Sequence, residues 1–411
     1  MSNNNTTIAV AMSGGVDSSV SAALLKEQGY NVLGFFMKNW GDDTHGLKKS
    51  ECPWLQDRED AMRVAAKLDI PFHTLDFEDE YRKQVLDYFF REYKLGRTPN
   101  PDIMCNAEIK FGVFLRKAVR LGADMIATGH YTRTSHVILN KRLDVPIEEC
   151  SEGSRESRAS FDEGILRSTP AGYSSRSSQD DGVIQLLKGV DQNKDQSYFL
   201  YRLNQEQLSK AMFPVGEYEK TEVRKLAKKF GLPNHDKRDS QGVCFIGHLD
   251  LRKFLSQKIK EEPGDIVLIS AGADNHLPVR KIGAHKGLFW YTIGQRKGIN
   301  VGGIGPFYVV KKDLKKNQLI VTNNPKDERL YSSSVVIEDV NWISGRDVTH
   351  RVSVDCDARI RYREKLTKCT IEDVQGGKYK VKFKEPQYAV ASGQSAVFYD
   401  GDVCLGGGVI V

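Results

Sequence analysis

The chain has 411 residues, of which 40% are hydrophobic and 28% are charged, and its formal net charge is +6. This composition predicts a soluble globular protein of two or three domains, and no apolar run approaches the roughly 20 residues that span a bilayer, which excludes a membrane-spanning protein. The seven cysteines form no C-x-x-C pair. That pattern argues against a zinc site and, with an odd number of thiols, against a secreted disulfide scaffold.

The N-terminal part alternates apolar strand patterns with helical patterns. Strands are predicted at residues 8–12, 31–37, 71–75 and 125–128, and helices at 19–28, 57–68, 78–92 and 109–120. Such alternation predicts a parallel sheet that is covered by helices on both faces. Ligands of these sheets bind beyond the carboxyl ends of the strands, where Gly14-Gly15 and Gly129-His130 are expected to lie.

The rhythm breaks at residues 140–182, a Ser-, Arg- and Asp-rich segment that predicts a disordered insertion between two strands. A strand at 184–187 and a basic helix at 221–230 follow. From about Pro263 strand and turn patterns dominate, which predicts a small connector and an all-β barrel. The expected strands lie at 265–270, 289–293, 307–311, 319–322, 335–340, 351–360, 378–383, 389–398 and 403–405. The predicted domains are 1–248, 249–315 and 325–411.

The most informative motif is the glycine-rich turn between the first strand and the first helix, Ala11-Met12-Ser13-Gly14-Gly15-Val16-Asp17-Ser18-Ser19. Glycines let the backbone approach an anion, and a helix N-terminus can hold phosphate. The turn lacks the Gly-Lys-Ser/Thr ending of a Walker loop and the third glycine of a dinucleotide fingerprint. The SGGxDS pattern resembles the pyrophosphate loop of ATP-pyrophosphatases, against the alternative of an ordinary strand–helix turn.

Two cysteines lie in segments that favour a reactive thiol. Cys105 ends a proline-stiffened loop, residues 96–106, and is expected near the N-terminus of a helix, whose dipole favours a thiolate. Lys110 is a nearby cation, and Asp102 is placed to act as a general acid or base. Cys244 lies between glycines and follows two basic residues. The alternative for both cysteines is a buried, inert side chain.

Three polar segments are ambiguous by themselves. Residues 194–200 read as a polar turn that enters a buried element, and residues 294–298 as a basic turn. Residues 359–363 alternate basic and aromatic side chains, which suits contact with RNA phosphates and stacking on a base. A solvated strand face is the alternative.

Together, these segments resemble one family, the tRNA-specific 2-thiouridylases, over nearly the whole chain except the insertion. The resemblance rests, in chain order, on AMSGGVDSS, FFMKNW, GRTPNPDIMCN, EIKFG, ATGHY, KDQSYFLY, FPVGE, DSQGVCFIG, TIGQRKG, RIRYR and GQSAVFYDGDVCLGGG. It implies an α/β fold in which a parallel-sheet ATP-pyrophosphatase domain is followed by a small connector and a C-terminal β-barrel that contacts tRNA. It also implies an enzyme that adenylates carbon 2 of the wobble uridine and replaces its oxygen with sulfur.

The resemblance also implies roles for particular residues. ATP, with Mg²⁺ and no permanently bound metal, is expected at Ala11, Met12, Ser13, Gly14, Gly15, Val16, Asp17, Ser18, Met37 and Gly129. Cys244 is expected to carry a persulfide delivered by a sulfur-donor protein. Cys105 is expected to be the nucleophile that ends in a disulfide with Cys244, with Asp102 as acid or base. The tRNA contacts are expected at Asn100, Pro101, Asp102, Lys194, Asp195, Gln196, Arg361 and Tyr362.

Two other functions fit parts of the sequence. One is an ATP-pyrophosphatase of the synthetase or amidating type, which needs no paired thiols. The other is a non-catalytic tRNA-binding protein that uses the barrel. The long insertion indicates an organellar member and places the expected compartment in the mitochondrion, with the cytoplasm as the alternative because no transit peptide is evident.

Overall fold

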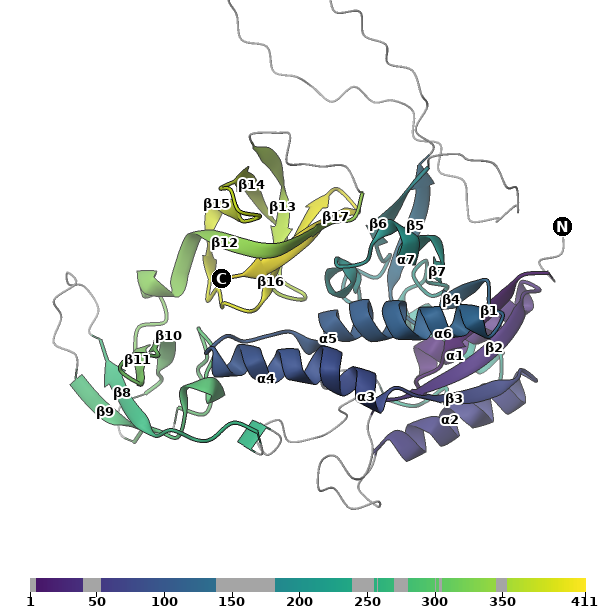
Figure 1. Ribbon diagram of the computed structural model, residues 1–411, viewed down its shortest axis with the longest axis horizontal. Coiled ribbons are helices and arrows are strands. Elements are labelled where there is room, and N and C mark those ends of the chain that lie inside the picture. Colours follow the sequence, from purple (N-terminus) through teal and green to yellow (C-terminus); the bar gives the residue numbers. More distant parts are fainter. Residues whose placement is uncertain are drawn as a thin grey trace, which may run out of the picture.

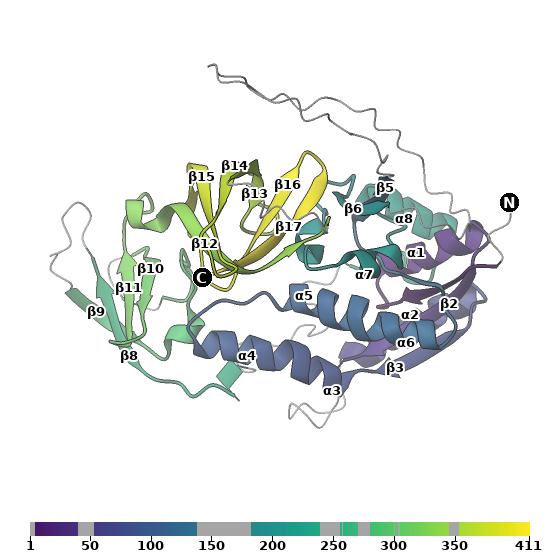
Figure 2. The ribbon, with the colours of Figure 1, turned by 45° about the horizontal axis from the view of Figure 1, so that its top comes forward.

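The computed structural model describes residues 5–39, 53–137, 182–238, 255–256, 258–269, 280–299, 301–302, 305–344 and 353–411. Cys244 lies outside the described residues, as does nearly all of the predicted insertion. Within the described ranges no helix combines the length and the apolar character needed to cross a membrane. The parallel sheet lies at one end of the molecule and a small four-stranded sheet at the other, with the barrel between them (Figures 1 and 2).

The N-terminal sheet has five strands in the order β3-β2-β1-β4-β7, and all neighbours are parallel. The strands are β1 (Thr7–Ala11), β2 (Asn31–Lys38), β3 (Phe72–Asp76), β4 (Met125–Ala127) and β7 (Ala211–Met212). The sheet and its four predicted strands are therefore confirmed. β7 was not predicted, because a strand of two residues leaves no periodic pattern.

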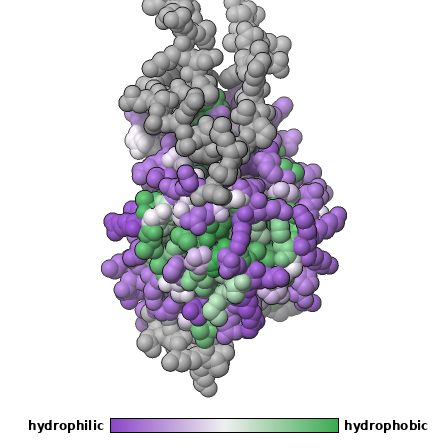
Figure 3. Space-filling view, turned by 90° about the vertical axis from the view of Figure 1, so that its right-hand side faces the viewer, coloured by the Kyte–Doolittle hydropathy of each residue, from purple (hydrophilic) through white to green (hydrophobic). Residues whose placement is uncertain are grey.

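Both faces of this sheet are buried. Successive side chains of β1 point to opposite sides of the sheet, so alternate residues pack into different cores. Ile8 and Val10 belong to a core that includes residues of α1 (Val16–Glu27), α2 (Pro53–Lys67) and α8 (Lys220–Lys229). Ala9 and Ala11 belong to a second core on the other face. Seen from this end of the molecule, hydrophilic side chains surround an area where apolar residues are visible (Figure 3).

Two long helical rods cover the second face, and they run alongside each other in both ribbon views (Figures 1 and 2). One is built from α3 (Glu78–Tyr81), a π-helical turn at Arg82–Leu86 and α4 (Asp87–Lys94). The other is built from α5 (Pro101–Met104), a π-helical segment η3 (Cys105–Phe114) and α6 (Leu115–Arg120). We call the second rod the thiol helix, because it carries Cys105.

The thiol helix begins eight residues before its predicted start at 109. The Asn100 side chain accepts a hydrogen bond from the backbone N–H of Asp102 (3.1 Å), and Pro101 occupies the first helical position. Asparagine followed by proline is a strong helix-start signal, because the amide satisfies an orphan N–H and proline has none to satisfy. The prediction that Cys105 ends a loop was therefore wrong: Cys105 lies inside a helix.

The C-terminal region forms a closed six-stranded barrel, because β12 pairs with both β15 and β17. Its strands are β12 (Tyr331–Trp342), β13 (Val354–Arg359), β14 (Thr367–Asp373), β15 (Tyr379–Tyr388), β16 (Ser395–Asp400) and β17 (Val403–Ile410). The predicted barrel is confirmed. The strand expected at 389–398 starts only at Ser395, because residues 389–394 form a turn instead.

A hairpin of the N-terminal domain extends the barrel sheet. β5 (Thr132–Val137) pairs with β6 (Val183–Lys188), and β6 pairs with β17 through Leu187 and Val403. The predicted insertion lies between these two strands in the sequence. The N-terminal domain and the barrel therefore share one continuous sheet.

The small sheet has the order β10-β11-β8-β9, from β8 (Gly264–Leu268), β9 (Arg280–His285), β10 (Tyr308–Asp313) and β11 (Gln318–Thr322). The strand predicted at 289–293 was wrong, because Leu288–Trp290 form a short 3-10 helix whose Leu288 and Phe289 are buried. The remaining described elements are the 3-10 turns Ser197–Leu200 and Glu328–Leu330 and the helix α7 (Gln205–Ser209).

Candidate active site

The glycine-rich turn joins β1 to α1 in a shape that its own side chains fix. Gly14 has a φ of +75°, and Gly15 precedes α1 without a side-chain cap. The Ser19 hydroxyl donates to the Gly15 carbonyl at 2.8 Å, and the Ser13 N–H donates to the Ser18 hydroxyl oxygen at 3.2 Å. A helix N-terminus presented by a glycine turn is an anion-binding arrangement.

Two glycines are required here because other backbone segments come very close. A Cβ on Gly14 would lie 2.1 Å from the Asp57 carbonyl oxygen at the start of α2. A Cβ on Gly129 would lie 2.6 Å from the backbone nitrogen of Ser18. The residue after the end of β4 therefore lies directly against Asp17 and Ser18 in the first turn of α1. The role of Gly14 and Gly129 toward ATP stays a prediction.

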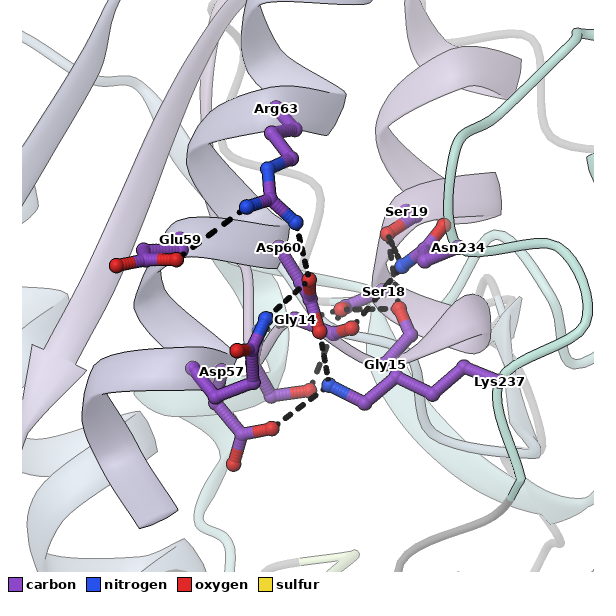
Figure 4. A network of polar contacts seen from close by, with 12 residues as sticks. Gly14, Gly15, Ser18, Ser19, Asp57, Glu59, Asp60, Arg63, Asn234 and Lys237 are labelled. Carbon is purple, nitrogen blue, oxygen red and sulfur yellow. Dashed lines mark hydrogen bonds and ion pairs between the residues drawn. The ribbon is translucent and has the colours of Figure 1, made fainter. Parts of the chain in front are cut away.

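Two side chains near this turn were not assigned to it from the sequence. The buried Asn234 amide donates to the Gly14 carbonyl and to the Ser19 hydroxyl, both at 3.0 Å. Lys237 bonds Asp57 at 2.7 Å and Asp60 at 2.6 Å, beside the same turn (Figure 4). Burial lowers the pKa of Lys237, but its bonds to the two carboxylates outweigh burial and raise it. Lys237 is one of the two basic residues that precede Cys244 and favoured a reactive thiol there, and the structure shows it paired with Asp57 and Asp60 of α2.

The Asp17 carboxylate is held by a cation and a phenol. Lys220 Nζ lies 2.6 and 2.9 Å from its two oxygens, and the Tyr131 hydroxyl donates to it at 2.7 Å. These contacts join α1 to α8 and to the short connection between β4 and β5, where Tyr131 lies. Two other predicted nucleotide residues, Met12 directly after β1 and Met37 on β2, are buried. Their contact with ATP stays a prediction.

Cys105 is fully buried on the thiol helix, one helical turn after the partly exposed Asp102. The neighbouring Asn106 amide donates to the Phe199 carbonyl at 3.2 Å, which fixes this helix against the polar turn at residues 194–200. Helix-dipole effects fade beyond the first turn. Cys105 is the fifth helical residue, so the dipole supports a thiolate less than the sequence suggested.

Lys110 lies on the same helix and contacts a buried histidine. Its Nζ is 3.4 Å from Nε2 of His130, whose Nδ1 is 2.7 Å from the Thr128 hydroxyl. Because ammonium only donates, Nε2 accepts and Nδ1–H donates to Thr128. Burial, and then the Lys110 charge, lower the pKa of His130 well below 6.5. His130 is therefore neutral at physiological pH.

Several predicted tRNA contacts have structural partners within the protein. Pro101 is buried, and the Asn100 amide caps the thiol helix. The Asp195 carboxylate is buried and paired with Arg359 of β13, and the Gln196 side chain accepts from the Tyr131 N–H at 3.0 Å. Lys194 is partly exposed. Their roles toward RNA stay predictions.

The basic and aromatic run at 359–363 is a turn rather than a strand face. β13 ends at Arg359, and Arg363 has a φ of +66°. Arg361 donates to the carbonyls of Ile293 and Ala389, and thereby joins the barrel to the small sheet's domain. The Tyr362 ring lies 4.5 Å from the Phe199 ring, so this turn reaches the segment that contacts the thiol helix.

These features define the class of the protein. It has a parallel-sheet domain with a glycine-rich turn of the nucleotide-binding kind, followed by two β modules. Its segments match three family descriptions: the tRNA methyl transferase HUP domain at residues 6–157 and 162–248, the tRNA methyl transferase PRC-barrel domain at 252–323, and the aminomethyltransferase beta-barrel domain at 332–410.

The chain is 45% identical to the tRNA-specific 2-thiouridylase MnmA of Listeria monocytogenes over 100% of its length and 96% of that protein's. It is 42% identical to the MnmA of Staphylococcus aureus with the same coverage. The chain therefore belongs to the tRNA-specific 2-thiouridylase family. A solved NMN synthetase from Francisella tularensis, 12% identical, aligns over 60% of this chain and 71% of its own with a TM-score of 0.31.

Proposed function

We infer that the protein is a tRNA-uridine 2-sulfurtransferase, which replaces the carbon-2 oxygen of the wobble uridine with sulfur while ATP is converted to AMP and pyrophosphate. The observation that carries this inference is the 45% identity to a tRNA-specific 2-thiouridylase over the whole chain, all three modules included. A nucleic-acid substrate also suits the net charge of +6.

The glycine-rich turn supports the activating half of the reaction. The carbon-2 oxygen is a poor leaving group, and its attack on the α-phosphorus of ATP makes it the oxygen of an adenylate and releases pyrophosphate. The N-terminus of α1 behind Gly14 and Gly15 is suited to hold the phosphates. Mg²⁺ would enter with ATP and neutralise phosphate charge. Within the described ranges, no group of three or more His, Cys, Asp or Glu side chains suited to a metal occurs.

The two thiols would carry out the sulfur transfer. A donor protein passes a sulfur atom to Cys244 as a persulfide, whose terminal sulfur attacks carbon 2 and expels AMP. The Cys105 thiolate then attacks the Cys244 sulfur, the S–S bond breaks, and its electron pair leaves on the thiouridine sulfur. The product is a Cys105–Cys244 disulfide, which a thiol reductant must reduce with two electrons before the next cycle. Asp102, one helical turn before Cys105, is the acid or base that we propose for the proton.

The experiment that tests this function uses the purified full chain with a tRNA transcript, Mg-ATP and a persulfide donor. Digestion of the tRNA and mass spectrometry of its nucleosides should show 2-thiouridine at the wobble position, and the Cys105→Ser variant should form none. A turnover rate equal to that of the wild type in both Cys105→Ser and Cys244→Ser would favour an ATP-pyrophosphatase of the synthetase type, which needs no paired thiols. A tRNA affinity that is the same with and without ATP, together with no thionucleoside formed, would favour the binding-protein alternative.

A further inference from the structure

Thr98, seven residues before Cys105, contacts both of the other modules. Its backbone N–H donates to the Ser392 carbonyl of the barrel at 2.8 Å, and its carbonyl accepts from the Gln394 side-chain amide at 2.7 Å. Its hydroxyl lies 3.2 Å from the Thr292 hydroxyl, in the module of the small sheet. A single residue of the N-terminal domain is thus held from two sides.

The barrel side of this contact is a firmly anchored turn. The Gly393 N–H donates to the Ile410 carbonyl and the Ile410 N–H donates to the Gln394 carbonyl, both at 2.8 Å. Gly393 has a φ of +90°, and a Cβ there would lie 2.8 Å from the Thr98 nitrogen. The turn is therefore shaped to receive the Thr98 backbone, and it is tied to the last strand of the barrel.

On the side of the N-terminal domain, the chain runs from Thr98 directly into the thiol helix. Only Pro99 separates Thr98 from Asn100, whose side chain caps that helix, and Pro101 is its first residue. Both prolines are buried, and each fixes its own φ. A displacement of Thr98 therefore cannot be absorbed by a flexible linker before it reaches Asp102 and Cys105.

We propose that Gln394 is a positioning residue for the sulfur transfer: by holding the Thr98 carbonyl, the barrel sets the start of the helix that carries Asp102 and Cys105. This inference rests on the proposed function. The barrel carries the predicted RNA contact, the turn at Arg361 and Tyr362. The proposal gives a reason why the same barrel also binds the segment that precedes Cys105. The module that holds the tRNA would then also fix where the nucleophile lies relative to the bound uridine.

The test compares variants that alter this contact with one that does not. Gln394→Glu keeps the side-chain size but replaces the donor with an acceptor facing the Thr98 carbonyl. Gly393→Ala adds a Cβ against Thr98. The matched control is Gly376→Ala, at another barrel turn with a positive φ (+67°) and nothing within 4 Å of the added Cβ. Thermal unfolding of each variant identifies general damage to the barrel.

We expect Gln394→Glu and Gly393→Ala to lower kcat for thiolation by about tenfold to a hundredfold, since small misplacements of a reacting group cost that much. KM for tRNA should stay at the wild-type value, and Gly376→Ala should keep the wild-type kcat. The rate of Cys105 alkylation by iodoacetamide, followed by peptide mass spectrometry, should rise in the first two variants alone.

Wild-type kcat and alkylation rates in Gln394→Glu and Gly393→Ala would overturn the proposal. So would losses that the Gly376→Ala control shares. Because the alkylation rate needs no product, it decides the positioning role even if the wild-type protein forms no 2-thiouridine, which would refute the proposed function instead.

Discussion

Asp195 and Arg359 form an ion pair in the interior between the N-terminal domain and the barrel. Asp195 Oδ2 lies 2.9 Å from Arg359 Nη1, and the two side chains are 0% and 7% exposed. The other carboxylate oxygen accepts from the backbone N–H groups of Gly189 (3.2 Å) and Ser197 (3.1 Å). The barrel is therefore joined to the turn at residues 194–200 by charges that water does not screen.

Loss of one partner of this pair should destabilise the whole protein. Arg359→Met leaves the Asp195 charge buried without its cation, and we expect a loss of about 3–5 kcal/mol in the free energy of unfolding by urea. The double variant Asp195→Asn/Arg359→Met should lose less than the sum of the two single changes. Lys368→Met is the control, because Lys368 and Asp357 also lie 2.9 Å apart on the barrel but Lys368 is exposed. An equal loss in that control would contradict this account.

The two glycines of the nucleotide turn should respond differently to alanine. Gly14→Ala places a Cβ 2.1 Å from the Asp57 carbonyl at a φ of +75°, so the turn must move and ATP binding, measured by calorimetry, should be lost. Gly15→Ala is the matched change one residue on. Its Cβ would meet only the Ser13 hydroxyl oxygen at 3.4 Å, and its φ is −84°. Similar ATP affinities for the two variants would show that the close approach at Gly14 does not matter.

His130 should make stability depend on pH below neutrality. Its pKa is well below 6.5 in the folded protein, so below pH 6.5 the unfolded chain binds a proton that the folded chain does not. The free energy of unfolding should then fall as the pH is lowered from 6.5, by up to about 1.4 kcal/mol per pH unit from this group. His130→Asn should flatten the curve between pH 6.5 and 5. Parallel curves for the two proteins would mean that His130 is protonated when folded.

The sequence was most informative where a local residue pattern and a general rule of parallel-sheet folds lead to the same prediction. The apolar runs at β1 and β4 and the glycines that follow them predicted a shared sheet edge, and the approach of Gly129 to Ser18 confirms it. The same local reasoning misread Asn100-Pro101 as a turn, because a helix cap and a turn use the same residue types.

Other parts of the site depend on partners far apart in the chain. Asn234 reaches Gly14 across 220 positions, and Lys220 reaches Asp17 across 203. Nothing near either residue indicates its partner. The extension of the barrel sheet by β6 is equally hidden, because the pattern of a strand does not say which edge it joins. The persulfide role of Cys244 and the mitochondrial compartment stay predictions.

The central claim is that ATP cleavage at the glycine-rich turn serves sulfur transfer that needs the thiol helix. The most direct measurement is wobble 2-thiouridine formed by the purified protein, scored together with pyrophosphate release, in the wild type and in Cys105→Ser. We predict 2-thiouridine and pyrophosphate from the wild type, and pyrophosphate without 2-thiouridine from Cys105→Ser. Equal amounts of 2-thiouridine from both proteins would contradict the account.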